Sequence, residues 1–299
     1  MKVAKGFTLV ELSLSMVFIA ILSIIIVLII NNAISSYHRG ITLNQINTVG
    51  TDIVTDMRSV VQNSPASPLT NYCENYQEDL TVKEACKSDG ARNYVSVEKV
   101  ISVEDKSSGE SEQVPIFGAF CTGSFSYIWN SGYYYSEETN KVGDNAEATF
   151  SYKIIEDGKE KDVTYENRIK LLKVKDNDRR VCISAIENSK KSYHTGNYIL
   201  SNQFRSNEIV KDGEEPVELL AENSNMALYD LTTTIPAESK DTAFYTVSFI
   251  LGTIQGGINI NTIGNACATP KGYNSGIANF DYCAINKFNF AAWAGGKNG

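Results

Sequence analysis

The sequence predicts an α+β protein in which one long N-terminal helix packs against an antiparallel β-sheet head. An apolar run fills residues 7–30, and an amphipathic pattern with helical spacing continues through 31–64. Short segments of alternating apolar and polar residues, separated by turn residues, recur within 65–299. We therefore expect a leader at 1–6, a membrane-length helix at 7–30, a stalk helix at 31–64 and an extracytoplasmic head at 65–299.

The apolar run from Phe7 to Ile30 is long enough to cross a membrane. At 1.5 Å per residue it extends about 36 Å as a helix, and the hydrocarbon core of a bilayer is about 30 Å thick. Lys2 and Lys5 are the charged residues that precede it. The positive-inside rule therefore predicts a single pass of the cytoplasmic membrane, with the N-terminus inside and the head outside.

Glu11 lies within this apolar run, where a carboxylate costs about 2.5 to 3.5 kcal/mol on insertion scales and is expected to have a charged partner. The stretch Lys5-Gly6-Phe7-Thr8-Leu9-Val10-Glu11-Leu12 resembles the processing site of type IV prepilins and of the related type II secretion pseudopilins. By this resemblance, a prepilin peptidase would cut after Gly6 and methylate the new terminal amine of Phe7. Glu11 would then pair with the terminal amine of a neighbouring subunit during assembly.

The resemblance implies a filament subunit whose partners are the prepilin peptidase, other pilin subunits and, before assembly, the cytoplasmic membrane. The large head is similar to those of minor pilins and of J-type (W-type) pseudopilins, and the apolar run lacks the helix-breaking Pro or Gly of many major pilins. We expect a minor pilin. A type II secretion or competence pseudopilin is the first alternative, and a single-span anchored surface binding protein is the rival from another class.

The stalk helix is predicted from apolar residues that recur at steps of mostly three and four positions between Ile34 and Val60. Residues 63–68, which include two prolines, should end it. Gly40 and Gly50 lie inside the pattern, so two shorter helices with a bend remain an alternative to one rod.

Composition excludes several function classes. The chain has 299 residues, a net charge of -8 and two histidines, and it has no phosphate-binding loop, metalloprotease motif or nucleophile elbow. We expect no enzyme activity, no metal, no cofactor and no specific nucleic acid partner, since phosphate binding requires Lys and Arg.

The six cysteines of an exported chain predict a disulfide framework with 15 conceivable pairings. We expect two local pairs and one pair between predicted strands: Cys73 with Cys86, Cys267 with Cys283, and Cys121 with Cys182.

Strand signals begin after the stalk, and the centre of the chain predicts an antiparallel meander. A tight hairpin is expected at Asp157-Gly158, because glycine readily adopts a positive φ. A second hairpin should turn at residues 176–178, for which a plain turn is favoured over a calcium loop. The expected strands are 94–103, 114–121, 125–129, 148–155, 161–166, 168–174, 179–184, 217–220, 226–232 and 244–251, with one more at 198–200.

Aromatic residues gather around Asn130-Ser131-Gly132, namely Tyr127, Trp129, Tyr133, Tyr134 and Tyr135. They are candidates for a surface-binding platform, since aromatic rings supply large contact area with a polar handle. The alternative is strand core, which we favour. The tail aromatics Phe288, Phe290 and Trp293 are expected in the core rather than in a tip contact.

Overall fold

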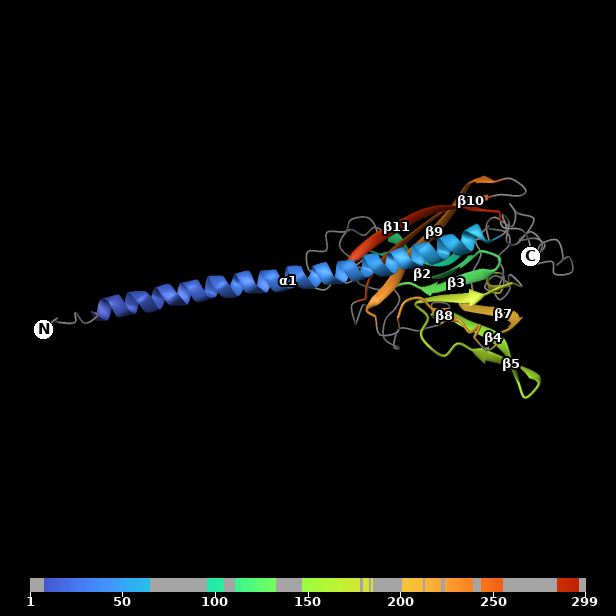
Figure 1. The fold of residues 1–299 in the computed structure, drawn as a ribbon, viewed down its shortest axis with the longest axis horizontal. Coiled ribbons are helices and arrows are strands. Elements are labelled where there is room, and N and C mark those ends of the chain that lie inside the picture. Colours follow the sequence, from blue (N-terminus) through green and yellow to red (C-terminus); the bar gives the residue numbers. More distant parts are fainter. Residues whose placement is uncertain are drawn as a thin grey trace.

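The computed structural model describes residues 8–64, 96–104, 111–132, 147–177, 180–182, 184, 201–211, 213–221, 224–238, 243–254 and 284–295. A single helix extends far beyond a β-rich head, and only its C-terminal half lies along that head (Figure 1). The predicted α+β class is therefore correct at this level.

The helix α1 runs without interruption from Leu9 to Gln62, and Asn63 caps its C-terminus. Its 54 residues correspond to about 80 Å. Gly40 and Gly50 both lie within the continuous helix, so the bent alternative is wrong. The helix ends where the sequence predicts, immediately before the segment that contains the prolines.

Eleven strands form three sheets in the described residues. The five-stranded sheet has the order β1-β2-β3-β6-β8, formed by Ser96–Glu104, Ser111–Cys121, Phe125–Asn130, Leu171–Lys175 and Val217–Glu218. The sheet β5-β4-β7 consists of Lys159–Thr164, Thr149–Glu156 and Gln203–Ile209. The sheet β11-β10-β9 consists of Ile285–Ala294, Ala243–Thr253 and Met226–Glu238.

The five-stranded sheet is the middle layer, because both of its faces are buried. Along β3, Ile128 points into a core shared with β4 and β7, whereas Tyr127 and Trp129 point into a core shared with α1 and the sheet β11-β10-β9. Side chains alternate between the two faces of a strand, so one strand serves two cores. This explains why β3 carries large apolar side chains on both of its faces.

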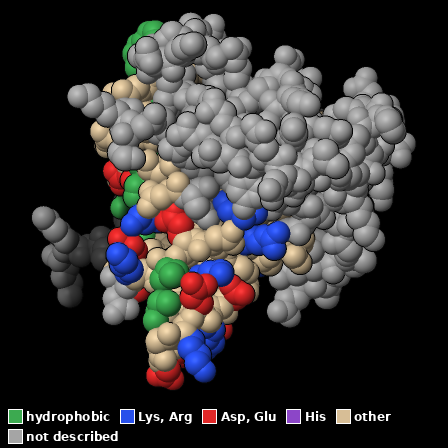
Figure 2. Space-filling view, turned by 90° about the vertical axis from the view of Figure 1, so that its right-hand side faces the viewer, with side chains coloured by type: hydrophobic (Ala, Val, Ile, Leu, Met, Phe, Trp, Pro, Cys, Tyr) green, Lys and Arg blue, Asp and Glu red, His purple; other side chains and the backbone are tan. Residues whose placement is uncertain are grey.

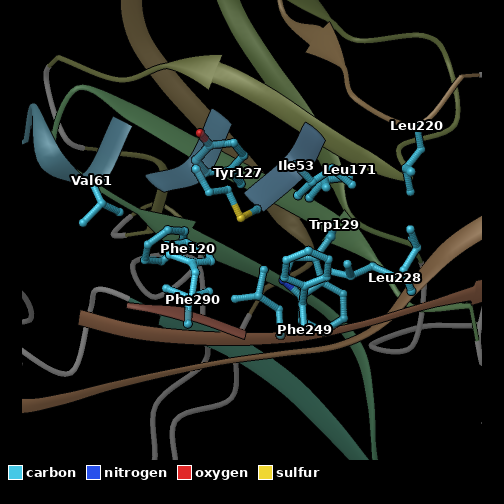
Figure 3. Packing of buried hydrophobic residues seen from close by; sticks show 14 of the residues in the cluster. Ile53, Val61, Phe120, Tyr127, Trp129, Leu171, Leu220, Leu228, Phe249 and Phe290 are labelled. Carbon is cyan, nitrogen blue, oxygen red and sulfur yellow. The ribbon is translucent and has the colours of Figure 1, made fainter. Parts of the chain in front are cut away.

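The C-terminal half of α1 lies in the second core (Figure 3). Ile46, Ile53, Met57 and Val61 are buried there, at the helical spacing that the sequence predicts. Gly50 allows the closest approach: a Cβ at this position would lie 2.1 Å from Cζ of Phe288 on β11. The ring of Phe288 therefore occupies the space that a side chain at residue 50 would need.

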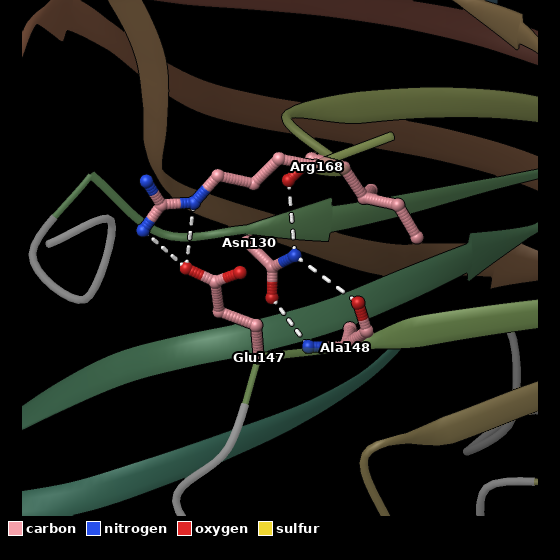
Figure 4. Close-up of polar contacts among 5 residues, drawn as sticks. Asn130, Glu147, Ala148 and Arg168 are labelled. Carbon is pink, nitrogen blue, oxygen red and sulfur yellow. Dashed lines mark hydrogen bonds and ion pairs between the residues drawn. The ribbon is translucent and has the colours of Figure 1, made fainter. Parts of the chain in front are cut away.

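Asn130 at the end of β3 joins two chain segments (Figure 4). Its side-chain oxygen accepts from the backbone N–H of Ala148 at 2.7 Å, and its amide nitrogen donates to the carbonyl of Ile169 at 2.9 Å. Beside it, Nε of Arg168 donates to Oε1 of the buried Glu147 at 2.8 Å. These contacts fix the entry into β4 and the approach to β6.

The structure confirms the tight turn at Asp157-Gly158, where φ is 53° and 74°, between β4 and β5. The predicted hairpin of 168–174 with 179–184 is wrong, because the chain after β6 makes a helical turn. The buried carboxylate of Asp176 accepts from the backbone N–H groups of Arg180 and Val181, at 2.9 and 3.3 Å. A capped helical turn replaces the strand there.

Two strands were not predicted. β7 pairs in parallel with β4, so the centre is not a purely antiparallel meander, and β11 forms from the tail. The strand expected at 198–200 lies outside the described residues.

Candidate functional site

The N-terminal half of α1 is the most unusual surface among the residues that the structure describes. From Leu9 to Ile30 its large apolar side chains are between 45% and 85% exposed, and the head covers none of this stretch. A soluble domain rarely leaves such a continuous apolar surface uncovered. α1 is long and apolar enough to cross a membrane, and the described residues contain no second helix of that kind.

The hydroxyl groups in this stretch are satisfied within the helix. Ser13 donates to the carbonyl of Val10 at 2.9 Å, and Ser15 donates to that of Leu12 at 2.8 Å. Ser23 does the same toward Ile19. They therefore present little polarity to an apolar environment.

Thr8 and Glu11 form a capping box at the start of the helix. Oε2 of Glu11 accepts from the backbone N–H of Thr8 at 3.0 Å and from its hydroxyl at 2.9 Å. In return, the backbone N–H of Glu11 donates to the Thr8 hydroxyl at 3.3 Å. The spacing Thr-x-x-Glu is the sequence signal from which this arrangement could have been predicted.

The capping box has a chemical consequence for Glu11. Its carboxylate oxygens can accept more hydrogen bonds than the two from Thr8, and they lie beside the position that precedes the helix. A positively charged group that approaches this end of the helix would find an oriented acceptor. Gly6 and Phe7, the predicted processing residues, lie outside the described residues.

Tyr127 and Trp129 are both 0% exposed, so they do not form the candidate surface-binding platform and lie in the core, as favoured from the sequence. The hydroxyl of Tyr127 donates to Oδ2 of Asp56 on α1 at 2.8 Å, so it helps to attach the helix. The residues 133–135 lie outside the described part of the chain.

Cys121, the last residue of β2, is bonded to Cys182 in the helical turn after β6, as predicted. The pairs Cys73 with Cys86 and Cys267 with Cys283 lie outside the described residues. Among the residues that the structure describes, no group of three metal-ligating side chains occurs. Asp176, the candidate in the calcium alternative, instead accepts from the hydroxyl of Ser126 at 2.6 Å and caps the turn.

Of the tail aromatics, Phe290 is buried and Phe288 is partly buried in the core with α1. Trp293 is 59% exposed, so the core prediction is wrong for this residue. Its position on β11 alternates with the inward-facing Ala292 and Ala294, and the strand geometry turns it outward.

No protein-family model, curated protein or solved structure matches this chain.

Proposed function

We propose that the chain is a structural subunit, a minor pilin, of a type IV pilus-like filament. The proposal rests on one combination: a prepilin-like stretch at Lys5–Leu12 opens an unbroken helix whose N-terminal half is uncovered and whose C-terminal half is docked on the head. Before assembly, the apolar half of α1 spans the cytoplasmic membrane and the head lies outside. During assembly, neighbouring apolar helices replace the lipid.

The role of Glu11 follows from the low dielectric of such an environment. After cleavage behind Gly6, the terminal amine of Phe7 on one subunit pairs with Glu11 on its neighbour, which sets the register between helices. In the single chain, Thr8 supplies the hydrogen bonds to the carboxylate. The capping box keeps Glu11 oriented until the intermolecular partner arrives.

A type II secretion or competence pseudopilin would use the same helix and the same processing. A minor pilin and a pseudopilin differ in whether an extended surface filament forms, and both require the prepilin peptidase. The rival from another class, an anchored surface binding protein, would keep α1 in the membrane permanently.

Mass spectrometry separates these functions. The full chain is expressed in its natural host, and the mature N-terminus is sequenced from membranes and from sheared filaments. A minor pilin begins at N-methylated Phe7 and is present in the sheared fraction. A pseudopilin is processed in the same way and stays with the cells. An uncut N-terminus at Met1 in every fraction would refute both and favour the anchored binding protein.

A further inference from the structure

The sheet β11-β10-β9 has a solvent face that differs from the rest of the described surface. Its inner face carries Tyr245, Val247, Phe249 and Leu251, all buried. The strand register places the outward residues in three cross-strand rows: Phe244 beside Trp293, Thr234 beside Thr246 and Ala291, and Thr232 beside Ser248 and Asn289. We name this surface, from the Phe244–Trp293 row to the Ser248 row, the hydroxyl face.

The first row is an aromatic pair in which Phe244 is partly buried and Trp293 is exposed. The rings of Phe244 and Trp293 lie 4.9 Å apart at an interplanar angle of 51°. Trp293 is 59% exposed, whereas Trp129, the other tryptophan of the chain, is fully buried. Phe244 packs against the indole at a tilt, and the exposed part of the Trp293 ring is accessible to a ligand.

The other rows supply hydrogen-bonding groups without charge. Within the described residues, the side chains of Thr246, Ser248 and Asn289 meet no hydrogen-bond partner. They stand on strands, whose backbone pairing holds them in place. Charged groups lie in the next row, where Asp230 and Lys287 flank Ile250 with opposite signs.

The described surface of the head at β4 and β5 is charged. Acidic and basic side chains are interspersed over the lower part of the head (Figure 2), and ion pairs such as Lys153–Glu160 and Lys161–Glu156 link β4 to β5. The three rows of the hydroxyl face, by contrast, contain no ionisable side chain. A neutral face offers no attraction to phosphate groups of nucleic acids or anionic lipids.

We propose that the hydroxyl face binds a neutral carbohydrate chain. The C–H face of a pyranose ring stacks on Trp293, and its hydroxyl groups bond to Thr246, Ser248 and Asn289, which both donate and accept. Successive rows are two residues apart along a strand, or about 6.8 Å, so the face is about 14 Å long. This length suits a short oligosaccharide. The site is independent of filament assembly.

The test uses the full chain in detergent and uncharged oligosaccharides of glucose, galactose, mannose and N-acetylglucosamine as probes. Saturation-transfer NMR and the emission of Trp293 report binding. We expect at least one sugar to receive saturation and to shift the tryptophan emission to shorter wavelength. In Trp293→Ala the affinity for that sugar, measured by NMR, should fall about tenfold.

The double variant Thr246→Val with Asn289→Ala should also weaken binding, since the hydroxyl and amide groups are then lost. Thr164→Val, at an exposed position on β5, is the matched control and should bind as the wild type does. The proposal is overturned if no sugar receives saturation from the wild type, or if Trp293→Ala binds equally well. Concentration-dependent sedimentation that Trp293→Ala abolishes, without sugar binding, would instead assign the face to a second copy.

Discussion

The carboxylate of Asp56 on α1 lies 2.6 Å from Nζ of Lys173 on β6 and accepts a hydrogen bond from the hydroxyl of Tyr127 on β3 at 2.8 Å. The ammonium group also lies 4.7 Å above the ring of Phe125. One acidic residue of the helix thus binds two strands of the five-stranded sheet. The side chains of Asp56 and Lys173 are 32% and 18% exposed, so solvent screens the pair only in part.

We expect Asp56→Asn to destabilise the head by about 1 to 2 kcal/mol, because Lys173 loses its ionic partner and the bond to Tyr127 weakens. Lys173→Met should cost less, since its aliphatic stem is retained. Chemical denaturation of the two single variants and the double variant measures the coupling energy, which should be about 1 kcal/mol. Additive single effects would show that the pair contributes nothing.

Gly50→Ala should destabilise the full chain by about 1 to 3 kcal/mol, because the new methyl group overlaps the ring of Phe288. Gly40 is the matched control, since a Cβ there meets nothing within 4 Å. Gly40→Ala should leave stability unchanged or raise it by up to about 1 kcal/mol through helix propensity. Thermal unfolding in detergent distinguishes the two, and equal effects at both positions would contradict the packing argument.

Glu11→Ala should be inserted and cleaved at the wild-type level but should be depleted from sheared filaments by about tenfold or more. The reason is that an amine in an apolar interface then lacks its carboxylate. Thr8→Ala removes the two hydrogen bonds that use the Thr8 hydroxyl, but it keeps the acid and the bond from the backbone N–H of residue 8 that orients it, so this variant is expected to assemble normally. Quantitative immunoblots of membrane and filament fractions provide the measurement. Wild-type abundance of Glu11→Ala in filaments would exclude the pairing role.

Stability should decrease as the pH rises from about 4.5 to about 7. Burial and the neighbouring Asp230 raise the pKa of Glu98 on β1 from 4.5 to about 7. In this window the folded state therefore holds a proton that the unfolded state has released, and folding is favoured at the acidic end. The effect is on the order of 2 kcal/mol, reduced by partial exposure.

Glu98→Gln should abolish most of this dependence and stabilise the protein above pH 7. Burial raises the pKa values of Asp230 and Glu218 as well, so part of the slope persists in the variant. Denaturation midpoints at a series of pH values test this, with Glu160→Gln on the exposed β4–β5 hairpin as the control. A wild-type curve that is flat or rises across the window would contradict the assignment.

Periodic patterns in the sequence predicted the helix and most strands because burial alone produces them. α1 shows an apolar run and then a helical stripe, and residues 244–251 of β10 alternate between inward and outward positions. The turn at Asp157-Gly158 was predictable from its backbone requirement. Such features depend on neighbours close in sequence.

The parts that the sequence analysis missed depend on distant neighbours. β7 is polar, with Phe204 as its fully buried apolar residue, and its pairing with β4 brings together segments about fifty residues apart. The tail carried a usable signal, because Phe288 and Phe290 alternate with polar residues, yet the surrounding Gly and Asn obscured it. The role of Gly50 could not be predicted, since it depends on a ring that lies far along the chain.

The contact between Gly50 and Phe288 also fixes an angle. Rotation of the head about the axis of α1 would bring the ring of Phe288 against a neighbouring residue that has a side chain. The contact at Gly50 therefore fixes the rotation of the head about the helix. Because α1 is unbroken, the direction in which Glu11 points from the helix axis is fixed relative to the head. Any contact that fixes the rotation of the apolar half of the helix therefore also fixes the orientation of the head.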